Sequence, residues 1–386
     1  MKSELELRKF VAPEYIFGVG ARRLAGRYAK NLGGKRILVV SDPGVVAAGW
    51  TQEVIESLLE EGLAYELFTG VSPNPRADEV MAGAEVFRSK KCNALVAVGG
   101  GSPMDCAKGI GIVYSNRQHI LEFVGVDKVG IPMPPLICIP TTGGTSADVS
   151  QFAIISNPIE KIKLAIISKS VVPDLSLIDP LTLTTLDPFL TACTGLDALT
   201  HGIEAYVSNA SSPMTDLHAL EAIRLINENL VASVKNPQDV ELRTKVMQAS
   251  LYAGLAFSNA ILGAVHAMAH SVGGERDAPH GECNAILLDH VIAFNLPASP
   301  ERFEQIALAM GVDLRGKTLI GKTKMLMKRV RELKREVGVA RVLKDVGVTR
   351  TDVPQLSEKA LHDPCLLTNP RRANRRDIEV IYEEAL

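Results

Sequence analysis

The sequence lacks any pair of closely spaced cysteines. Its six cysteines are scattered and form no CxxC pair, which excludes a disulfide framework and favours a reducing compartment. It also lacks an apolar run of about 18 residues, so no transmembrane helix is predicted. The first nine residues alternate between charged and apolar types, without the apolar core of a signal peptide. We therefore expect a cytoplasmic protein with no membrane partner.

An excess of charge of one sign is missing too. The chain has 42 Lys and Arg against 44 Asp and Glu, a net charge of −2. Nothing in this balance suggests a nucleic acid or an anionic membrane as a partner. Hydrophobic residues make up 46% and charged residues 22%, which is typical of a globular protein. At 386 residues the chain is too long for one ordinary core, so at least two domains are expected.

Strand-like and helical segments alternate in the first half of the chain. The strand-like runs are short and rich in Val, Ile and Leu: 36–41, 64–69, 93–98, 136–140 and 175–178, with a further one at 9–17 and a hairpin at 151–167. This alternation predicts a parallel sheet with right-handed crossovers. From residue 188 on, apolar residues recur at helical spacing. We predict an α/β domain over 1–184 and an all-helical domain over 185–386.

The strand at 93–98 runs into the loop Gly99-Gly100-Gly101-Ser102, which precedes a helix predicted from about residue 106. Glycines let backbone N–H groups approach a phosphate closely, at the positive end of the following helix. Ser102 could cap that helix. The loop therefore predicts a phosphate site, the alternative being a glycine-rich turn without a ligand.

A second loop of small polar residues, Thr141 to Ser146, follows the strand at 136–140. Ligands of open α/β sheets bind at the carboxyl ends of strands, so two such loops suggest a dinucleotide. Asp42 follows another strand and could bond the ribose hydroxyls of the cofactor. Its charge would repel a 2′-phosphate, which favours NAD over NADP. The alternative is that Asp42 only caps the turn before Pro43.

Histidines gather in the helical half. Asp197 and His201 are four residues apart, as are His266 and His270, and this spacing places two side chains on one face of a helix. His280 follows next to a glycine. A carboxylate and three imidazoles would bind a divalent first-row metal and leave a position for substrate. Spacing leaves open which three of the four histidines bind it, and each pair could also be an ordinary helical pair.

In its motifs the chain resembles the iron-dependent, group III alcohol dehydrogenases over nearly its whole length. The matching segments are Gly99 to Asp105, Pro140 to Thr145, Thr194 to His201, His266 to Gly281, and Pro364 to Arg371. The resemblance implies an N-terminal dinucleotide-binding α/β domain and a helical metal-binding domain, with the site in the cleft between them. The chain departs from the family in two places. It has Gly144-Thr145-Ser146-Ala147-Asp148 where many members end the loop in Gly-Ser-Glu, and it has Asp289 where a proline is usual.

The resemblance also assigns roles to individual residues. It implies that Asp197, His201, His266 and His280 hold the metal, and that His270 lies beside substrate and nicotinamide. There His270 could act catalytically as a proton shuttle, the alternative being a packing or supporting role. The positions that it assigns to cofactor binding are Asp42, Asn74, Gly99, Gly100, Gly101, Ser102, Asp105, Thr141, Thr142, Thr145 and Lys163. The metal is expected to be Fe(II), with Zn(II) as the alternative because this donor set also suits zinc.

The function expected from the resemblance is NAD-linked interconversion of small primary alcohols or diols and their aldehydes, with the metal acting as a Lewis acid. A homodimer or larger homo-oligomer is the family-level expectation. The alternatives on the same scaffold are a polyol or polyol-phosphate dehydrogenase and a dehydroquinate-synthase-like lyase. A metal hydrolase would need a general base such as Glu204 or Glu282, and a non-catalytic nucleotide-binding protein would leave the metal ligands unexplained.

Overall fold

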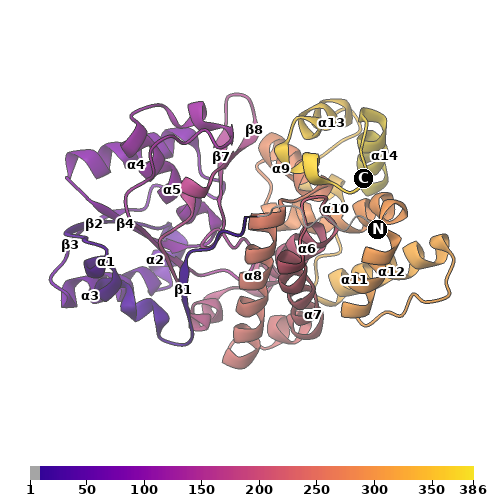
Figure 1. The fold of residues 1–386 in the computed structure, drawn as a ribbon, viewed down its shortest axis with the longest axis horizontal. Helices are drawn as coiled ribbons and strands as arrows, with labels where there is room; N and C mark the ends of the chain where they lie inside the picture. The colour runs from indigo at the N-terminus through magenta and orange to yellow at the C-terminus, as the bar shows by residue number, and fades with distance from the viewer. Residues whose placement is uncertain (1–8) are drawn as a thin grey trace.

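The computed structural model describes residues 9–386, which form an α/β half and a helical half side by side (Figure 1). The main sheet has six strands, and every pairing in it is parallel. Its strands, in spatial order, are β1 (Glu14–Phe17), β9 (Leu175–Ile178), β6 (Leu136–Pro140), β4 (Ala94–Gly99), β2 (Arg36–Val40) and β3 (Ala64–Phe68). The predicted parallel sheet is confirmed.

Helices cover both faces of this sheet (Figure 1). Neighbouring residues of a strand point to opposite faces, so Ile37 joins one buried hydrophobic cluster and Leu38 the other. The helices are α1 (Ala25–Asn31) and α3 (Trp50–Glu60) on the Ile37 side, and α4 (Ala77–Ser89) and α5 (Gly101–Asn116) on the Leu38 side. Burial of both faces explains why the central strands are continuous apolar runs rather than alternating ones.

A smaller sheet lies beside the main one. It consists of β5 (Gly125–Val126), β8 (Ile162–Ile167) and β7 (Phe152–Asn157), with β7 and β8 paired antiparallel. The hairpin expected from the sequence is therefore present. It carries Lys163 toward the helical half, where the backbone at Gly273 approaches so closely that a Cβ there would meet Lys163 Nζ at 2.8 Å.

After β9 the described chain contains helices only. Asp187 caps the first long helix by accepting a hydrogen bond from the Leu190 amide, and Pro188 occupies the first turn. The long helices are α6 (Pro188–Val207), α7 (Pro213–Lys235), α8 (Val240–Ala260), α9 (Ala264–Arg276), α10 (His280–Asn295), α11 (Pro300–Ala309), α12 (Leu319–Glu336), α13 (Val353–Leu361) and α14 (Arg375–Ala385). They share one large hydrophobic core, with α6 buried from Thr191 to its end.

Two local predictions are wrong. Strand β1 covers only the last four residues of the run predicted at 9–17. Helix α5 begins at Gly101 rather than at 106, and Ser102 does not cap it: its N-cap is Gly100, without a side-chain cap. Because Ser102 already lies inside the first turn, its hydroxyl instead accepts a hydrogen bond from the Asn74 amide at 3.2 Å.

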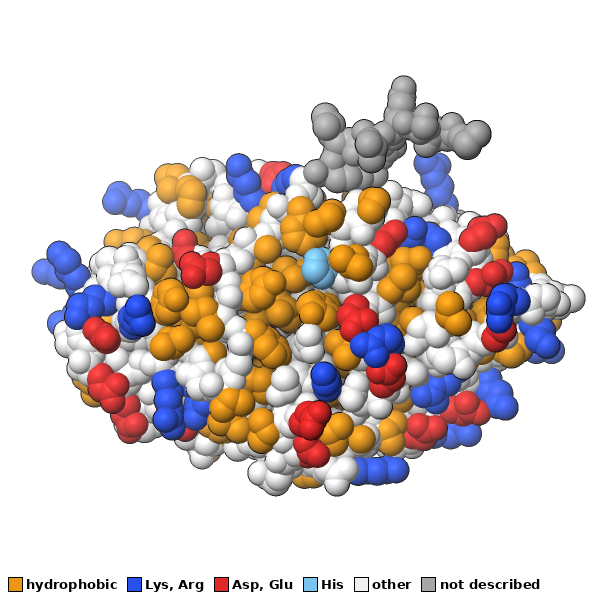
Figure 2. Space-filling view, turned by 60° about the horizontal axis from the view of Figure 1, so that its bottom comes forward, with side chains coloured by type: hydrophobic (Ala, Val, Ile, Leu, Met, Phe, Trp, Pro, Cys, Tyr) orange, Lys and Arg blue, Asp and Glu red, His pale blue; other side chains and the backbone are white. Residues whose placement is uncertain are grey.

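No single helix within residues 9–386 is both long and apolar enough to cross a membrane; α8 and α9 reach the required length and composition only when taken together, across a bend of 100°. On the face shown in Figure 2, acidic and basic side chains are interspersed around a central hydrophobic area. That face therefore carries no basic stripe of the kind that nucleic acids bind.

Candidate functional site

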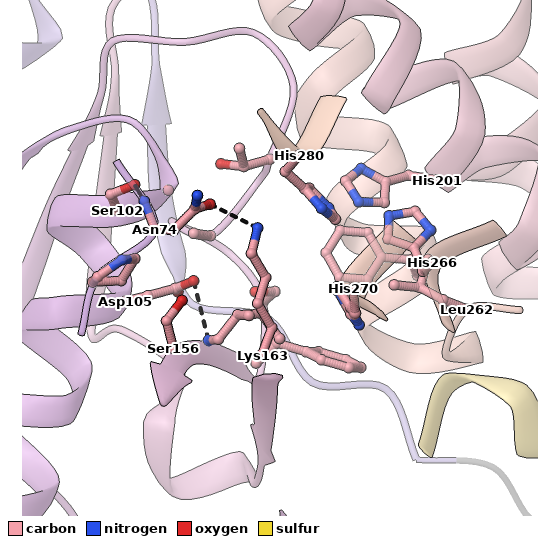
Figure 3. A pocket seen from close by; sticks show the side chains of 18 residues that line it. Asn74, Ser102, Asp105, Ser156, Lys163, His201, Leu262, His266, His270 and His280 are labelled. Carbon is pink, nitrogen blue, oxygen red and sulfur yellow. Dashed lines mark hydrogen bonds between the residues drawn. The ribbon is translucent and has the colours of Figure 1, made fainter. Parts of the chain in front are cut away.

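Two adjoining cavities open between the α/β half and the helical half. The inner cavity, of about 130 Å³, is lined on the helical side by His201, His266, His270 and His280 (Figure 3). The outer cavity, of about 640 Å³, is lined by the two glycine-containing loops and, on the helical side, by Asp197 and His280. The four residues predicted to bind a metal therefore stand where the two cavities meet.

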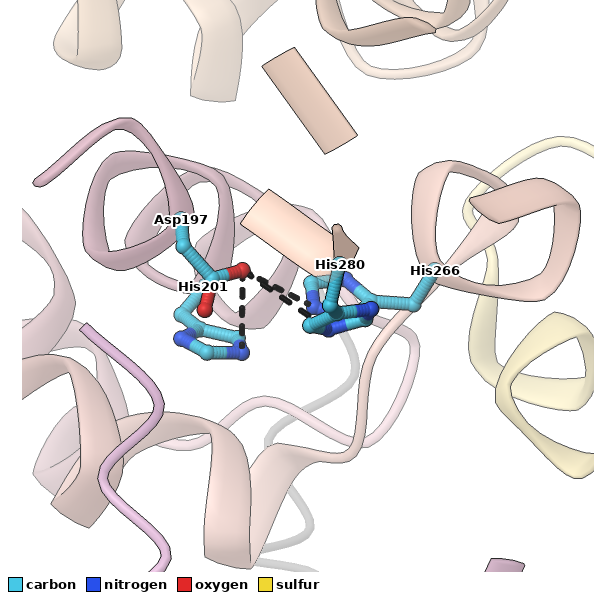
Figure 4. A group of neighbouring side chains, drawn as sticks. All are labelled: Asp197, His201, His266 and His280. Carbon is cyan, nitrogen blue, oxygen red and sulfur yellow. Dashed lines mark ion pairs between the residues drawn. The ribbon is translucent and has the colours of Figure 1, made fainter. Parts of the chain in front are cut away.

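These four side chains converge on one point (Figure 4). Asp197 Oδ1 lies 3.8 Å from Nε2 of each of His201, His266 and His280. Metal bonds to such atoms are about 2.0 to 2.2 Å long, so two ligands of one ion are at most about 4.4 Å apart. The separations fit a single ion, and the sequence prediction that these four residues share a site agrees with the geometry.

Their positions follow from three helices. Asp197 and His201 lie one turn apart on α6, whose surroundings bury both. His266 lies in the first turn of α9, and His280 is the first residue of α10. Close backbone contact brings the helices together, because a Cβ on Gly281 would meet the Cys193 carbonyl oxygen of α6 at 2.5 Å. Glycine at this position is what lets α10 present His280 to α6.

Hydrogen bonds fix the tautomers of two of the imidazoles. His266 Nδ1 donates to Glu204 Oε2 at 2.5 Å, and His201 Nδ1 donates to the Gly144 carbonyl at 3.2 Å. Each ring therefore keeps an Nε2 lone pair for the cage that it faces, which is how ligand histidines are usually oriented. Gly144 belongs to the second glycine-containing loop, so one of these bonds also joins the loop to the cage.

Burial sets the protonation state of the cage. It lowers the pKa of His201 to about 4 and that of His266 to about 3, and it also lowers the pKa of His280. All three imidazoles are thus neutral near pH 7, as metal binding requires. Burial also raises the pKa of Glu204 to about 7. The three neutral imidazole nitrogens and the Asp197 carboxylate are a donor set that suits Fe(II) or Zn(II).

The two loops predicted to bind a dinucleotide lie side by side at the carboxyl ends of β4 and β6. The Thr141 amide donates to the Gly99 carbonyl at 2.9 Å. A Cβ on Gly100 or Gly101 would come within 3.1 and 3.2 Å of the Thr142 and Thr145 side chains. Residues of both loops line the outer cavity, but Gly99 lines neither the inner nor the outer one. Its φ of +154° instead makes the turn that starts α5.

Asp42 combines the two interpretations made from the sequence. Its Oδ1 accepts the Val45 amide at 3.0 Å as the N-cap of the short helix α2 (Pro43–Ala47). The same residue lines the outer cavity. Capping therefore does not remove the carboxylate from the place where a ribose-binding acid is expected.

Lys163 and Asn74 meet across the inner cavity (Figure 3). Lys163 Nζ donates to Asn74 Oδ1 at 2.6 Å, and burial lowers the pKa of the ammonium group. Asn74 Nδ2 donates in turn to Asp277 Oδ1 at 2.8 Å, in the loop before His280. These bonds connect the α/β half to the loop that leads into α10, whose first residue is the predicted metal ligand His280.

Asp105 faces the inner cavity only. Its Oδ2 accepts the Ile154 amide at 3.1 Å, whereas its buried Oδ1 has no hydrogen-bond partner among the described residues and lies 4.0 Å from Lys108 Nζ. Burial raises the pKa of this carboxyl group to about 6. A carboxyl oxygen left free in this way can accept a hydrogen bond from a molecule bound in the cavity.

His270 lies outside the cage but lines the inner cavity with it. Its Nδ1 donates to Asp363 Oδ2 at 2.8 Å. The sequence prediction named His270 and missed its partner, although Asp363 directly precedes the quoted Pro364. It also gave Glu204 no role beside His266 and missed Asn284. Both could have been found from helical spacing, because Glu204 follows His201 by three residues and Asn284 follows His280 by four.

Comparisons with known proteins cover almost the whole chain. Residues 12–180 match a family model described as iron-containing alcohol dehydrogenase, and residues 191–386 match one described as the C-terminal part of the Fe-containing alcohol dehydrogenase family. The chain is 40% identical over 372 residues to a 1,3-propanediol dehydrogenase of Klebsiella pneumoniae, covering 96% of each protein. It is 36% identical over 377 residues to an NAD-dependent methanol dehydrogenase of Bacillus methanolicus, covering 98% of this chain and 99% of that one.

The structure is similar to solved ones as well. It matches the crystal structure of a 1,3-propanediol oxidoreductase with a TM-score of 0.95 at 39% identity, covering 99% of this chain and 100% of that one. The match includes both halves of the molecule. The relative placement of the two halves, and hence the cleft between them, is therefore common to both proteins.

Proposed function

This chain belongs to the iron-containing alcohol dehydrogenase family and is an alcohol oxidoreductase, as its sequence motifs indicated. We propose from this that it interconverts small primary alcohols or diols and their aldehydes, with NAD as the hydride carrier. Asp197, His201, His266 and His280 would hold the metal, Fe(II) rather than Zn(II). The observation that carries the proposal is the position of this cage at the junction of a small cavity and a larger one.

When bound, the metal would supply Lewis acidity to the substrate oxygen and the nicotinamide would carry the hydride. The residues that line the inner cavity would position the substrate against both. Phe152, Phe257 and Leu262 line the inner cavity with apolar surface, which excludes water and fits a short uncharged carbon chain. Among residues 9–386, Lys163 carries the one ammonium group that lines it, and this group already donates to Asn74. A phosphorylated substrate is therefore less well supported than a simple alcohol.

His270 would hold or release the proton of the alcohol. Asp363 accepts from Nδ1, which leaves the lone pair of the neutral ring on Nε2. An imidazole oriented by a carboxylate in this way can take up a proton at Nε2 and pass it on. Asp363 and His270 also line a third cavity beside α13, which offers a way out for that proton.

The hydrolase alternative has no support in the geometry. Glu204 accepts from His266 and from the Val265 amide, and Glu282 pairs with Arg341 at 2.6 Å. Neither carboxylate lines the inner or the outer cavity. Neither could therefore activate a water molecule at the metal, whereas the two glycine-containing loops have a clear purpose in a dehydrogenase.

Compartment and assembly belong to the same proposal. All six cysteines are buried free thiols, which supports a reducing compartment such as the cytoplasm. A homodimer or larger homo-oligomer is expected, and light scattering on the purified protein would measure it; a monomer at micromolar concentration would contradict this part.

The decisive experiment is to remove metal, reload the protein with Fe(II) or Zn(II) without air, and follow NADH formation with a panel of small alcohols and diols. Metal-dependent NADH formation is expected, with NADP slower. His280→Gln should abolish it, whereas His290→Gln, on the same helix and outside the cage, should not. Metal-independent turnover, or none with any alcohol or aldehyde, would refute the proposal.

A further inference from the structure

A second group of potential metal ligands lies beside the cage and shares no residue with it. It consists of His270 on α9 together with Asp363 and Cys365, which lie at the start of the short helix η7 (Pro364–Thr368). His270 and Cys365 are buried, and the Asp363 side chain is only 7% exposed. The proposed reaction uses the imidazole and the carboxylate but gives the Cys365 thiol no role.

Asp363 holds this group together. Its Oδ2 accepts His270 Nδ1 at 2.8 Å, and its Oδ1 accepts the Cys365 amide at 2.8 Å as the N-cap of η7. The backbone that carries the thiol is therefore fixed by the same carboxylate that orients the imidazole. Nitrogen, oxygen and sulfur donors are thus already positioned by existing hydrogen bonds.

The separations suit one zinc ion. The three donor atoms all lie within 4.8 Å of one another. Zinc bonds are about 2.1 Å long to nitrogen or oxygen and about 2.3 Å to sulfur, so two ligands of one ion stand up to about 4.4 Å apart. A sulfur movement of about 0.4 Å is therefore enough to close the site. A thiolate in the donor set favours Zn(II) over harder ions such as Mg²⁺.

The third cavity gives an ion access to this group. It has a volume of about 410 Å³, lies beside α13, and is lined by His270 and Asp363. Three protein ligands leave one position of a tetrahedral zinc ion open, and a water molecule from this cavity can fill it. An ion can therefore reach the group without passing through the inner cavity.

The balance of charge favours a divalent ion over protons at this place. Burial raises the pKa of Cys365 well above its usual value, so the metal-free thiol keeps its proton beside the Asp363 carboxylate. Zn²⁺ bound to one carboxylate and one thiolate is neutral overall, which avoids an unpaired buried charge. The Cys365 proton would leave to solvent, and the His270 proton would move from Nδ1 to Nε2. Because the thiol proton is costly to remove, this group should bind metal more weakly than the cage.

We propose that His270, Asp363 and Cys365 form a second metal site, for zinc, which fills after the cage and inhibits the enzyme. With an ion on Nδ1, the imidazole carries its proton on Nε2 and has no lone pair left for the proton of the alcohol. The inhibition rests on the proposed function of His270, whereas zinc binding itself does not.

Co²⁺ distinguishes the two sites, because a thiolate ligand adds a charge-transfer band in the near ultraviolet and the four cage ligands include no sulfur. We expect the wild-type apoprotein to bind two equivalents of Co²⁺ without air, with this band appearing only at the second. Cys365→Ser keeps the size of the side chain and should bind one equivalent without the band. Cys283→Ser is the matched control, since Cys283 is a buried thiol three residues after His280; it should titrate like wild type.

The titration separates failure of this site from failure of the cage. A wild-type titration that ends at one equivalent without the band would overturn the second site and leave the cage intact. A band that persists in Cys365→Ser, or disappears in Cys283→Ser, would also overturn it. A single equivalent that does show the band would instead overturn the proposed cage.

Inhibition is measured on the Fe(II)-loaded enzyme without air, with NAD and a small alcohol. Added Zn²⁺ should lower turnover while bound iron, measured by metal analysis, stays constant. Cys365→Ser should need at least about tenfold more Zn²⁺ for the same fractional loss of turnover. Turnover that zinc leaves unchanged, equal sensitivity of the two proteins, or a loss of iron that matches the loss of turnover would overturn the inhibitory role.

Discussion

Glu204 offers the sharpest test of how the cage is held. Its carboxylate is buried on α6, three residues after His201, and accepts two hydrogen bonds at once. Oε2 accepts His266 Nδ1 at 2.5 Å, and Oε1 accepts the Val265 amide at 2.6 Å. Glu204→Gln preserves the shape of the side chain but has a single acceptor oxygen, so one of the two donors must remain unpaired. We expect this variant to fold and to bind the metal more weakly.

Two independent estimates of the loss agree. Removing the acceptor behind a ligand histidine typically costs 10-fold to 100-fold in metal affinity, or about 1.4 to about 2.7 kcal/mol. A buried donor left without a partner costs about 1 to 3 kcal/mol. If the glutamine oxygen stays with the Val265 amide, His266 bears the whole loss. If it stays with His266, the start of α9 shifts and the loss is at the lower end.

The assay is the transfer of metal from the loaded protein to a chromogenic chelator at pH 7.5, without air. Glu282→Gln is the matched control: it changes a buried carboxylate two residues from His280 whose partner is Arg341 rather than a ligand. Wild type and Glu282→Gln should release metal equally, and Glu204→Gln about 10-fold to 100-fold more readily. Equal retention in all three proteins would refute the reasoning that Glu204 supports the cage.

Three further predictions concern cofactor choice, proton transfer and pH. Asp42→Ser, which can still cap the Val45 amide, should shift the ratio of kcat/KM for NAD over NADP by at least about tenfold toward NADP, because repulsion of the 2′-phosphate is removed; an unchanged ratio would exclude Asp42 as the selector. His270→Ala should lower kcat by roughly 10²-fold or more while metal content, measured by atomic absorption, stays the same; full turnover would remove His270 from the proton path. Burial raises the pKa of Asp105 from 3.8 to about 6, so the folded state binds more protons between these values and loses stability as pH rises through them. Relative to Asp105→Asn, wild-type apoprotein should lose up to about 3 kcal/mol between pH 4 and 7 in urea unfolding; parallel stability curves would contradict this.

The strands of the α/β half could be predicted from the sequence because burial on both faces makes them apolar throughout, as in β4. The start of α5 could not. Its first turn contains glycine and a proline that the pattern assigns to a loop, yet Pro103 fits the third position of a helix, where no intrahelical N–H is needed. Local composition therefore placed the loop correctly and the helix boundary wrongly.

The site shows a similar division. Residue type and i, i+4 spacing brought Asp197 and His201 together, because one helix determines both positions. The pairs that orient the site are different, since Glu204 and His266 are 62 residues apart and His270 and Asp363 are 93 apart. No periodicity connects residues on separate elements. Only tertiary packing, here of α10 against α6 and α9 and of α9 against the short helix Pro364–Thr368, brings such pairs within hydrogen-bonding distance.

Helix α10 contains Asp289, at the position where the family resemblance leads to the expectation of a proline. An interior proline removes a helical hydrogen bond; Asp289 keeps it and lies buried against α12, accepting Arg331 Nε and Lys334 Nζ, each at 2.5 Å. A buried carboxylate is costly unless paired, so these contacts fix the helix against its neighbour. The opposite end of α10 carries His280 and Asn284, and a metal cage tolerates little displacement of its donors. Asp289 lines neither the inner nor the outer cavity. Asp289 therefore acts on the anchoring of the helix that carries His280 rather than on the lining of either cavity.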